Sequence, residues 1–193
     1  MATRDGTTRD GSTDRPAGRS LREEVGKRDP FESLPQEAYL SVQRTASVLS
    51  SSFTRLFREH GLSEATYNVL RILRGSARGT SAASGGRAPS PTCSEIGEQM
   101  VSPVPDVTRL VDRLQDRGLV KRTRSAEDKR IVRVEITRKG LELLAALDGP
   151  VMALHEKQLG AMSAADLARL VLLLTRARQA AASTPDDPGP KRA

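Results

Sequence analysis

Basic side chains are concentrated in one short part of this chain, residues 109–139. That stretch carries eleven arginines and lysines against five acidic residues, an excess of six positive charges out of a formal net charge of +7 for all 193 residues. Guanidinium and ammonium groups at this density favour a polyanionic partner. Ribosomal and membrane-surface proteins share a basic composition, so the total charge alone does not separate them. The concentration of the charge indicates a dedicated anion-binding unit.

A helix is the first element expected to position these cations. Apolar residues recur at i, i+3, i+4 and i+7 and form one stripe, whereas the opposite face is charged. The stripe consists of Val107, Leu110, Val111 and Leu114. Gly118 follows the last periodic residue and is expected to end the helix. This geometry keeps the arginines of the helix in solvent.

Two β-rich runs follow the helix, at residues 119–124 and 131–136. The six residues between them are too polar for a core and are typical of a hairpin tip. Upstream, Thr92 and Glu95 fit the capping box of a short helix. Two short helices followed by a basic hairpin predict a winged helix-turn-helix, which offers one probe to each groove of DNA.

The recognition helix is expected to begin at Ser102. This residue serves as its N-cap, Pro103 takes the first helical position, and Pro105 lies within the first turn. Backbone N–H groups in that turn have no helical partner, so both prolines are tolerated there. Beyond the hairpin we expect helices as well, with a kink or break at Gly149 and Pro150.

The predicted fold class is mainly α (α+β), a winged helix-turn-helix with N- and C-terminal dimerisation helices. An a/d-like apolar seam at residues 39–56 and a wide apolar face at 167–174 predict the subunit interface. Low apolar content predicts disordered tails. The expected segments are a tail at 1–30, a dimerisation helix at 31–61, the DNA-binding domain at 62–140 with a flexible insertion at 75–91, dimerisation helices at 141–182 and a tail at 183–193.

Other function classes find little support. The single cysteine, Cys93, excludes an internal disulfide and CxxC-type zinc clusters. We expect no metal, no cofactor and no catalytic residues, since neither a phosphate-binding glycine loop nor a nucleophile-base arrangement is evident. No apolar run has the length of a membrane span and no secretory signal is present, so we expect a cytoplasmic protein without a membrane partner.

Three motifs resemble the MarR family of transcriptional regulators. The short helix at 93–100 and the segment 107–122 are similar to the helix-turn-helix and first wing strand of that family. The wing residues Asp128-Lys-Arg130, followed by Ile136-Thr-Arg-Lys-Gly140, resemble the family signature D-x-R and L-T-x-x-G. The resemblance extends over roughly residues 34–180 and implies a homodimer, a palindromic operator in double-stranded DNA, and a small-molecule or oxidant signal that releases it.

The resemblance implies DNA contacts from two elements. Arg130 resembles the wing arginine that enters the minor groove, and Asp128 is expected to orient its guanidinium. Thr108 and Arg109 match positions near base edges and phosphates. Candidates on the recognition helix are Ser102, Pro103, Pro105, Asp106, Thr108, Arg109 and Arg113. Candidates on the wing are Arg122, Arg124, Asp128, Lys129 and Arg130.

Several alternatives stay open at this point. Arg130 and Arg113 could be solvated surface residues, and Asp106 could compensate the helix dipole rather than contact a cytosine. Cys93 could sense oxidants or simply be a small residue at a helix start. The leading prediction is a dimeric repressor. The alternative is a nucleoid-type protein that coats DNA without sequence preference.

Overall fold

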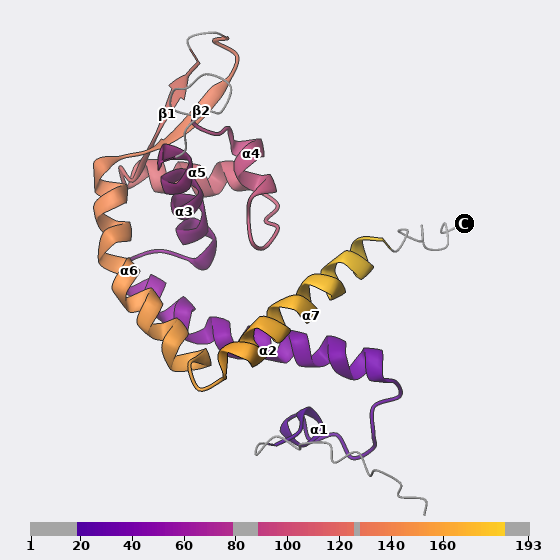
Figure 1. Ribbon diagram of the computed structural model, residues 1–193. Coiled ribbons are helices and arrows are strands. Elements are labelled where there is room, and N and C mark those ends of the chain that lie inside the picture. Colours follow the sequence, from indigo (N-terminus) through magenta and orange to yellow (C-terminus); the bar gives the residue numbers. More distant parts are fainter. Residues whose placement is uncertain (1–18, 79–88, 126–127, 184–193) are drawn as a thin grey trace, which may run out of the picture. The chain divides into compact units, whose positions relative to one another are not determined.

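The computed structural model describes residues 19–78, 89–125 and 128–183. In these ranges the chain is mainly helical with one two-stranded antiparallel wing (Figure 1), which confirms the predicted fold class. The elements are α1 (Leu21–Glu24), α2 (Leu34–Glu59), α3 (Glu64–Arg78), α4 (Cys93–Glu98), α5 (Val107–Asp116), β1 (Val120–Arg124), β2 (Val132–Ile136), α6 (Arg138–Leu159) and α7 (Ala164–Ala182). The chain divides into two compact units, up to Val48 and from Leu49 onward.

The second unit is organised around one apolar core. The last turns of α2 and the elements α3 to α6 all contribute to it, and burial of each large side chain stabilises the fold by about 1.5–3 kcal/mol. The side chains below 2% exposure are Leu70, Leu73, Ile96, Leu114, Leu119, Leu144, Leu147, Val69, Val111, Val120 and Val134. Because α5 and both wing strands share this core with α3, the helix-turn-helix and the wing form one structural unit.

Helix ends follow the local chemistry of the sequence. Thr92 and Glu95 form the expected capping box of α4, and Ser163 caps α7 through the N–H of Asp166. Gly118 follows Arg117, the C-cap of α5, and adopts φ +69°, as expected for a glycine that ends a helix in the left-handed region. Gly61 does the same after α2, with φ +66°.

The two wing strands pair in one antiparallel register, from Val120 opposite Ile136 to Arg124 opposite Val132. Side chains alternate along β1, so buried Val120 shares its face with Arg122. Residues just before α4 lie against the outer edge of the wing, because Val134 donates its backbone N–H to Pro91 at 2.8 Å. Arg133 also donates to the carbonyl of Ser90 at 2.8 Å. The wing is therefore anchored at its base.

The recognition helix begins later than expected. The N-cap of α5 is Asp106, whose Oδ1 accepts the N–H of Arg109 at 2.9 Å, and not Ser102. Pro103 and Pro105 therefore lie in the turn before the helix. A residue that precedes proline avoids helical backbone angles, so each proline opposes helix at Ser102 and Val104. Asp106 is the first strong capping residue beyond both prolines.

Two other helices run further than expected. α3 continues through Gly75 to Arg78, into the segment expected to be a flexible insertion, because Arg74 is anchored in the core by Asp148. Residues 79–88 of that insertion lie outside the described residues, and its end, at Ser90 and Pro91, is bonded to the wing rather than flexible. α6 passes through Gly149 and Pro150 without a break. Buried Leu147 and Val151 flank the proline and hold the helix in place.

The first unit contains α1 and the first half of α2. Residues 21–24 form a helical turn with a Ser20–Glu23 capping box, where a disordered tail over 1–30 was expected. Glu24 pairs with Arg44 of α2 at 3.4 Å, which gives this turn a tertiary contact that local composition does not reveal. The outer parts of both expected tails, 1–18 and 184–193, lie outside the described residues.

Candidate nucleic-acid interface

α5 presents a polar face to solvent. Val111 and Leu114 are buried in the core, whereas the opposite face of the helix is exposed. The exposed residues on α5 include Thr108, Arg109, Asp112, Arg113 and Asp116. A single helix with one free polar face fits the major groove of B-DNA, which is about 12 Å wide. The predicted contacts Thr108, Arg109 and Arg113 therefore lie together on one accessible surface.

Asp106 is engaged by its own helix. Its carboxylate accepts the backbone N–H of Arg109 and also forms an ion pair with the Nε of that residue at 3.1 Å. The capping role explains Asp106 without a base contact. Arg109 keeps 78% of its side chain exposed, and an ion pair this exposed contributes little energy. The Arg109 side chain can therefore leave Asp106 and bind DNA at little cost in energy.

The remaining predicted residues of this region lie at either end of the free face. Ser102, Pro103 and Pro105 are exposed in the turn before α5, rather than on the helix. Arg113 forms no ion pair or hydrogen bond with any other residue of the described part of the chain. An unpaired exposed guanidinium on this face is available to a phosphate group.

The tip of the wing is shaped by Asp128. Its Oδ1 accepts the backbone N–H of Arg130 at 2.9 Å, an Asx-type turn, and its own carbonyl accepts the N–H of Ile131 at 3.0 Å. Within the described residues the contact of Asp128 with Arg130 is to the backbone, and the expectation that Asp128 orients the Arg130 guanidinium stays a prediction. Lys129 and Arg130 are exposed beside it. Asp128 therefore orders the turn that presents Arg130.

Arg122 points away from the tip and toward α5. Its Nη1 donates to Asp112 Oδ1 at 2.6 Å and to Gln115 Oε1 at 3.2 Å, and its Nη2 donates to the carbonyl of Thr108 at 3.4 Å. Desolvation alone would lower the pKa of this guanidinium. The hydrogen bond and charge of Asp112, with the Cys93 thiol, outweigh it and raise the pKa. Arg122 thus stays charged and engaged with α5.

The structure separates cations that serve the fold from cations that are free. Arg117 donates to the carbonyls of Gly61 and His60, and Lys139 donates to the carbonyl of Arg117. Lys121 pairs with Glu135 across the wing at 3.1 Å. Charge counting along the sequence could not make this distinction. By contrast, Arg113, Arg124, Lys129 and Arg130 have no ion pair within the described ranges.

Comparisons with known proteins agree with this geometry. A model described as the MarR family matches residues 86–132. A crystal structure of a MarR transcription factor from Planctomyces limnophilus is 39% identical, covers 76% of this chain and 98% of its own length, and has a TM-score of 0.55. The chain belongs to the MarR family. It is therefore a DNA-binding transcriptional regulator with a winged helix, and not an enzyme.

More distant structures share the fold of this MarR-family protein. MepR of S. aureus, solved as a DNA complex, is 15% identical, with 74% of this chain and 96% of MepR covered and a TM-score of 0.61. An organohalide-sensing regulator solved with 2,4-dichlorophenol bound is 16% identical, with 79% and 86% covered and a TM-score of 0.65. At these identities the likeness concerns the fold alone.

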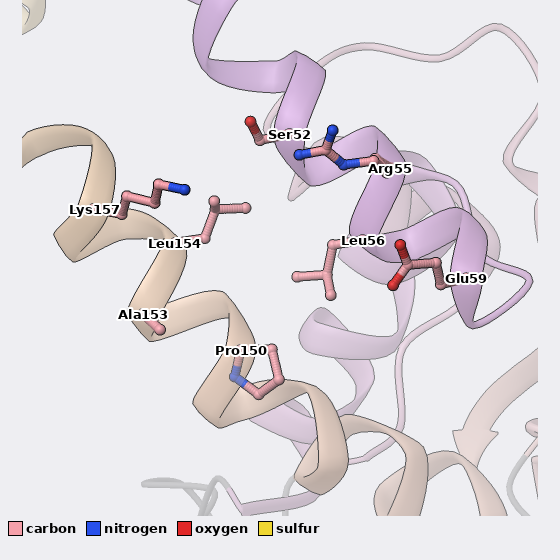
Figure 2. A pocket seen from close by; sticks show the side chains of 8 residues that line it. All are labelled: Ser52, Arg55, Leu56, Glu59, Pro150, Ala153, Leu154 and Lys157. Atoms are coloured by element: carbon pink, nitrogen blue, oxygen red, sulfur yellow. The ribbon is translucent and has the colours of Figure 1, made fainter.

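A large cavity of the MarR-family protein lies behind the helix-turn-helix. Its volume is about 720 Å³, and its walls come from α2, α3, α6 and the turn at 100–104. Four of the lining rings form two close pairs, with centroids 4.8 Å apart for Phe53 and His155 and 4.2 Å apart for Phe57 and Tyr67. A smaller hollow of about 290 Å³ lies between α2 and α6. In Figure 2, Leu56 and Leu154 face each other across it, with Arg55 and Lys157 nearby.

The described ranges hold neither a candidate metal site nor a single helix suited to a membrane. No cluster of three or more His, Cys, Asp or Glu residues there is arranged to hold a metal ion. None of the helices described is by itself both long and apolar enough to cross a membrane, and only α6 and α7 together, bent by 96°, have that length and composition.

Proposed function

We propose that this MarR-family regulator is a homodimeric repressor that reads a palindromic operator and is released by a small-molecule effector. The observation that carries the proposal is the presentation of two free basic elements by one rigid core. The polar face of α5 is suited to the major groove, and the wing tip with Arg130 to the minor groove. The proposed DNA-binding domain is residues 62–140, with dimerisation helices at 31–61 and 141–182.

The dimer is supported by uncovered apolar surface on α7. This helix buries none of its residues within the chain, and Val171, Leu172 and Leu173 are exposed by 64%, 48% and 51%. Large apolar side chains left exposed on a terminal helix are typical of a subunit interface. Light scattering of the purified protein is expected to give about twice the chain mass of 20.9 kDa. A monomer at micromolar concentration would contradict both the dimer and the palindromic site.

The effector is supported by the cavity behind the helix-turn-helix. Its walls are largely aromatic and apolar, a composition that suits a small aromatic molecule. The polar and charged groups in the lining are Glu64, Asn68, Arg71, Ser102 and His155. Met100 to Val104 form one wall and lead directly into α5, so a ligand there would contact the segment that positions the recognition helix. One relative of the same fold was solved with 2,4-dichlorophenol, which provides a probe.

A pair of tryptophan variants tests the cavity. Met152 lines the cavity and its neighbour Ala153 lines the smaller hollow instead (Figure 2). The phenol probe is expected to raise Tm and to dissociate operator DNA in the wild type and in Ala153→Trp, but not in Met152→Trp. A probe that binds and leaves DNA affinity unchanged would contradict effector release. Release by peroxide that is abolished in Cys93→Ser would instead favour an oxidant signal.

Selection of bound DNA from random or genomic fragments tests the operator. We expect one inverted repeat with half-sites about one helical turn apart. Recovery of DNA without a common motif would instead support the nucleoid-type alternative.

A further inference from the structure

Arg122 joins the wing to the recognition helix. It lies on β1, and its three acceptors, Thr108, Asp112 and Gln115, are spaced i, i+4 and i+7 on α5, so that they fall on one line along the helix. The three acceptors come from successive turns of α5 and converge on the single guanidinium of Arg122. Arg122 thus adds a polar contact between α5 and the strand to the apolar core that the two elements share.

The surroundings of Arg122 favour this internal role over a contact with DNA. Its side chain is 24% exposed, and the 2.6 Å bond to Asp112 is a short charge-assisted one. A phosphate contact would require that bond to break and would leave the carboxylate of Asp112 facing the DNA unpaired. Arg124 lies on the same strand face two residues closer to the tip, is exposed, and has no ion pair within the described ranges.

We propose that Arg122 is a positioning residue, which with Asp112 sets the spacing between the recognition helix and the wing and does not itself contact DNA. The inference rests on the proposed operator reading, because a fixed spacing matters only if both elements engage one site together. Loss of the Arg122–Asp112 bond lets α5 shift relative to the wing. The operator then loses more affinity than random DNA, on which no simultaneous base contacts are required.

Two variants, each of which neutralises one aspartate of α5, distinguish a positioning role of the Arg122–Asp112 bond from a general effect of charge. Asp112→Asn and Asp116→Asn each remove one negative charge from the exposed face of the helix, but of the two acids only Asp112 is bonded to Arg122. By electrostatics alone both variants should bind every DNA more tightly. We expect Asp116→Asn to do so and to keep the ratio of operator to scrambled-duplex affinity. Asp112→Asn is expected to lower that ratio about tenfold, and Asp112→Glu, which keeps the carboxylate, to restore part of it.

Salt dependence supplies the second readout. Arg122→Gln is expected to leave the slope of log K against log salt unchanged on random duplex, while Arg124→Gln lowers it by about one. A drop of about one for Arg122→Gln, or an unchanged ratio for folded Asp112→Asn, would overturn the proposal. A wild-type protein without operator preference would count against the proposed function instead. Even without operator preference, the slope of log K against log salt on random duplex, compared between the wild type and Arg122→Gln, shows whether Arg122 contacts phosphate.

Discussion

Arg74 of α3 donates two parallel hydrogen bonds to Asp148 of α6, from Nη1 to Oδ2 at 2.7 Å and from Nη2 to Oδ1 at 2.8 Å. Arg71 lies 3.6 Å from the same carboxylate. The hydrogen bond from Arg74 is the main cause of a lowered pKa at Asp148, and the same bond raises the pKa of Arg74. Only 10% of the Arg74 side chain is exposed, so its charge requires this partner.

Asp148→Asn is expected to destabilise the protein by about 1–3 kcal/mol, because it leaves a buried guanidinium without its counter-charge. The folded-state pKa of Asp148 is depressed, so its contribution is complete above the ordinary aspartate pKa of about 3.9 and is lost as pH falls through the lower folded value. Denaturant unfolding at neutral and acidic pH measures this. The two proteins should differ at pH 7 and converge in acid, and a pH-independent difference would contradict the assignment.

Gly140 is expected to tolerate no side chain. A Cβ at this position would collide with the carbonyl oxygen of Leu119 and lie 2.7 Å from Ile136 Cγ1. Gly140→Ala should therefore lower Tm by several degrees. Gly149→Ala is the matched control, since nothing lies within 4 Å of its Cβ and alanine is favoured in a helix by about 1 kcal/mol. Thermal melts that move in the same direction for both variants would contradict the close approach at Gly140.

Arg130→Ala is expected to weaken operator binding by about 1–3 kcal/mol without changing Tm, because an exposed wing arginine in a narrow minor groove is lost. Arg138→Ala is the control, because it removes another exposed cation, which pairs with Glu142 on α6. Titration of operator DNA compares the two variants. If both variants lose the same operator affinity, Arg130 at the wing tip contributes only through its general positive charge.

Arg109→Ala is expected to weaken the operator more than scrambled DNA and to relax the preference at one base position in each half-site. Lys121→Ala is expected to lower affinity for both DNAs alike and the salt slope by at most about one, because Glu135 already pairs with this lysine. Titrations of both DNAs across a salt series measure these effects. If Arg109→Ala weakens binding to both DNAs equally, α5 contacts the DNA backbone and does not read base sequence through Arg109.

The sequence was informative wherever local periodicity determines structure. The stripe of α5 predicted the burial of Val111 and Leu114, and the wing strands begin within one residue of their expected positions. The start of α5 was not decided locally, because Ser102 and Asp106 are both good capping residues. Pro103 and Pro105 disfavour helical backbone angles at the residues before them, Ser102 and Val104, and this favours Asp106.

Local sequence patterns could not predict which side chains pair across the tertiary structure. The partner of Arg74 lies 74 residues away, and no sequence signal pairs it with Asp148. Arg122 was named as a wing contact from the family resemblance, and that role is not tested by the structure. Its bond to Asp112 could not be read from the sequence, although strand alternation places Arg122 on the same face as buried Val120. Cations that bind backbone carbonyls, such as Arg117, are indistinguishable from DNA contacts in a sequence.

The most direct test of the account is the ratio of two dissociation constants, for the selected operator and for a scrambled duplex of equal length, at physiological salt. Sequence-specific reading by α5 and the wing predicts a ratio on the order of a thousand or more. A ratio below about ten, with the protein folded and dimeric, would contradict operator reading and identify a DNA-coating protein.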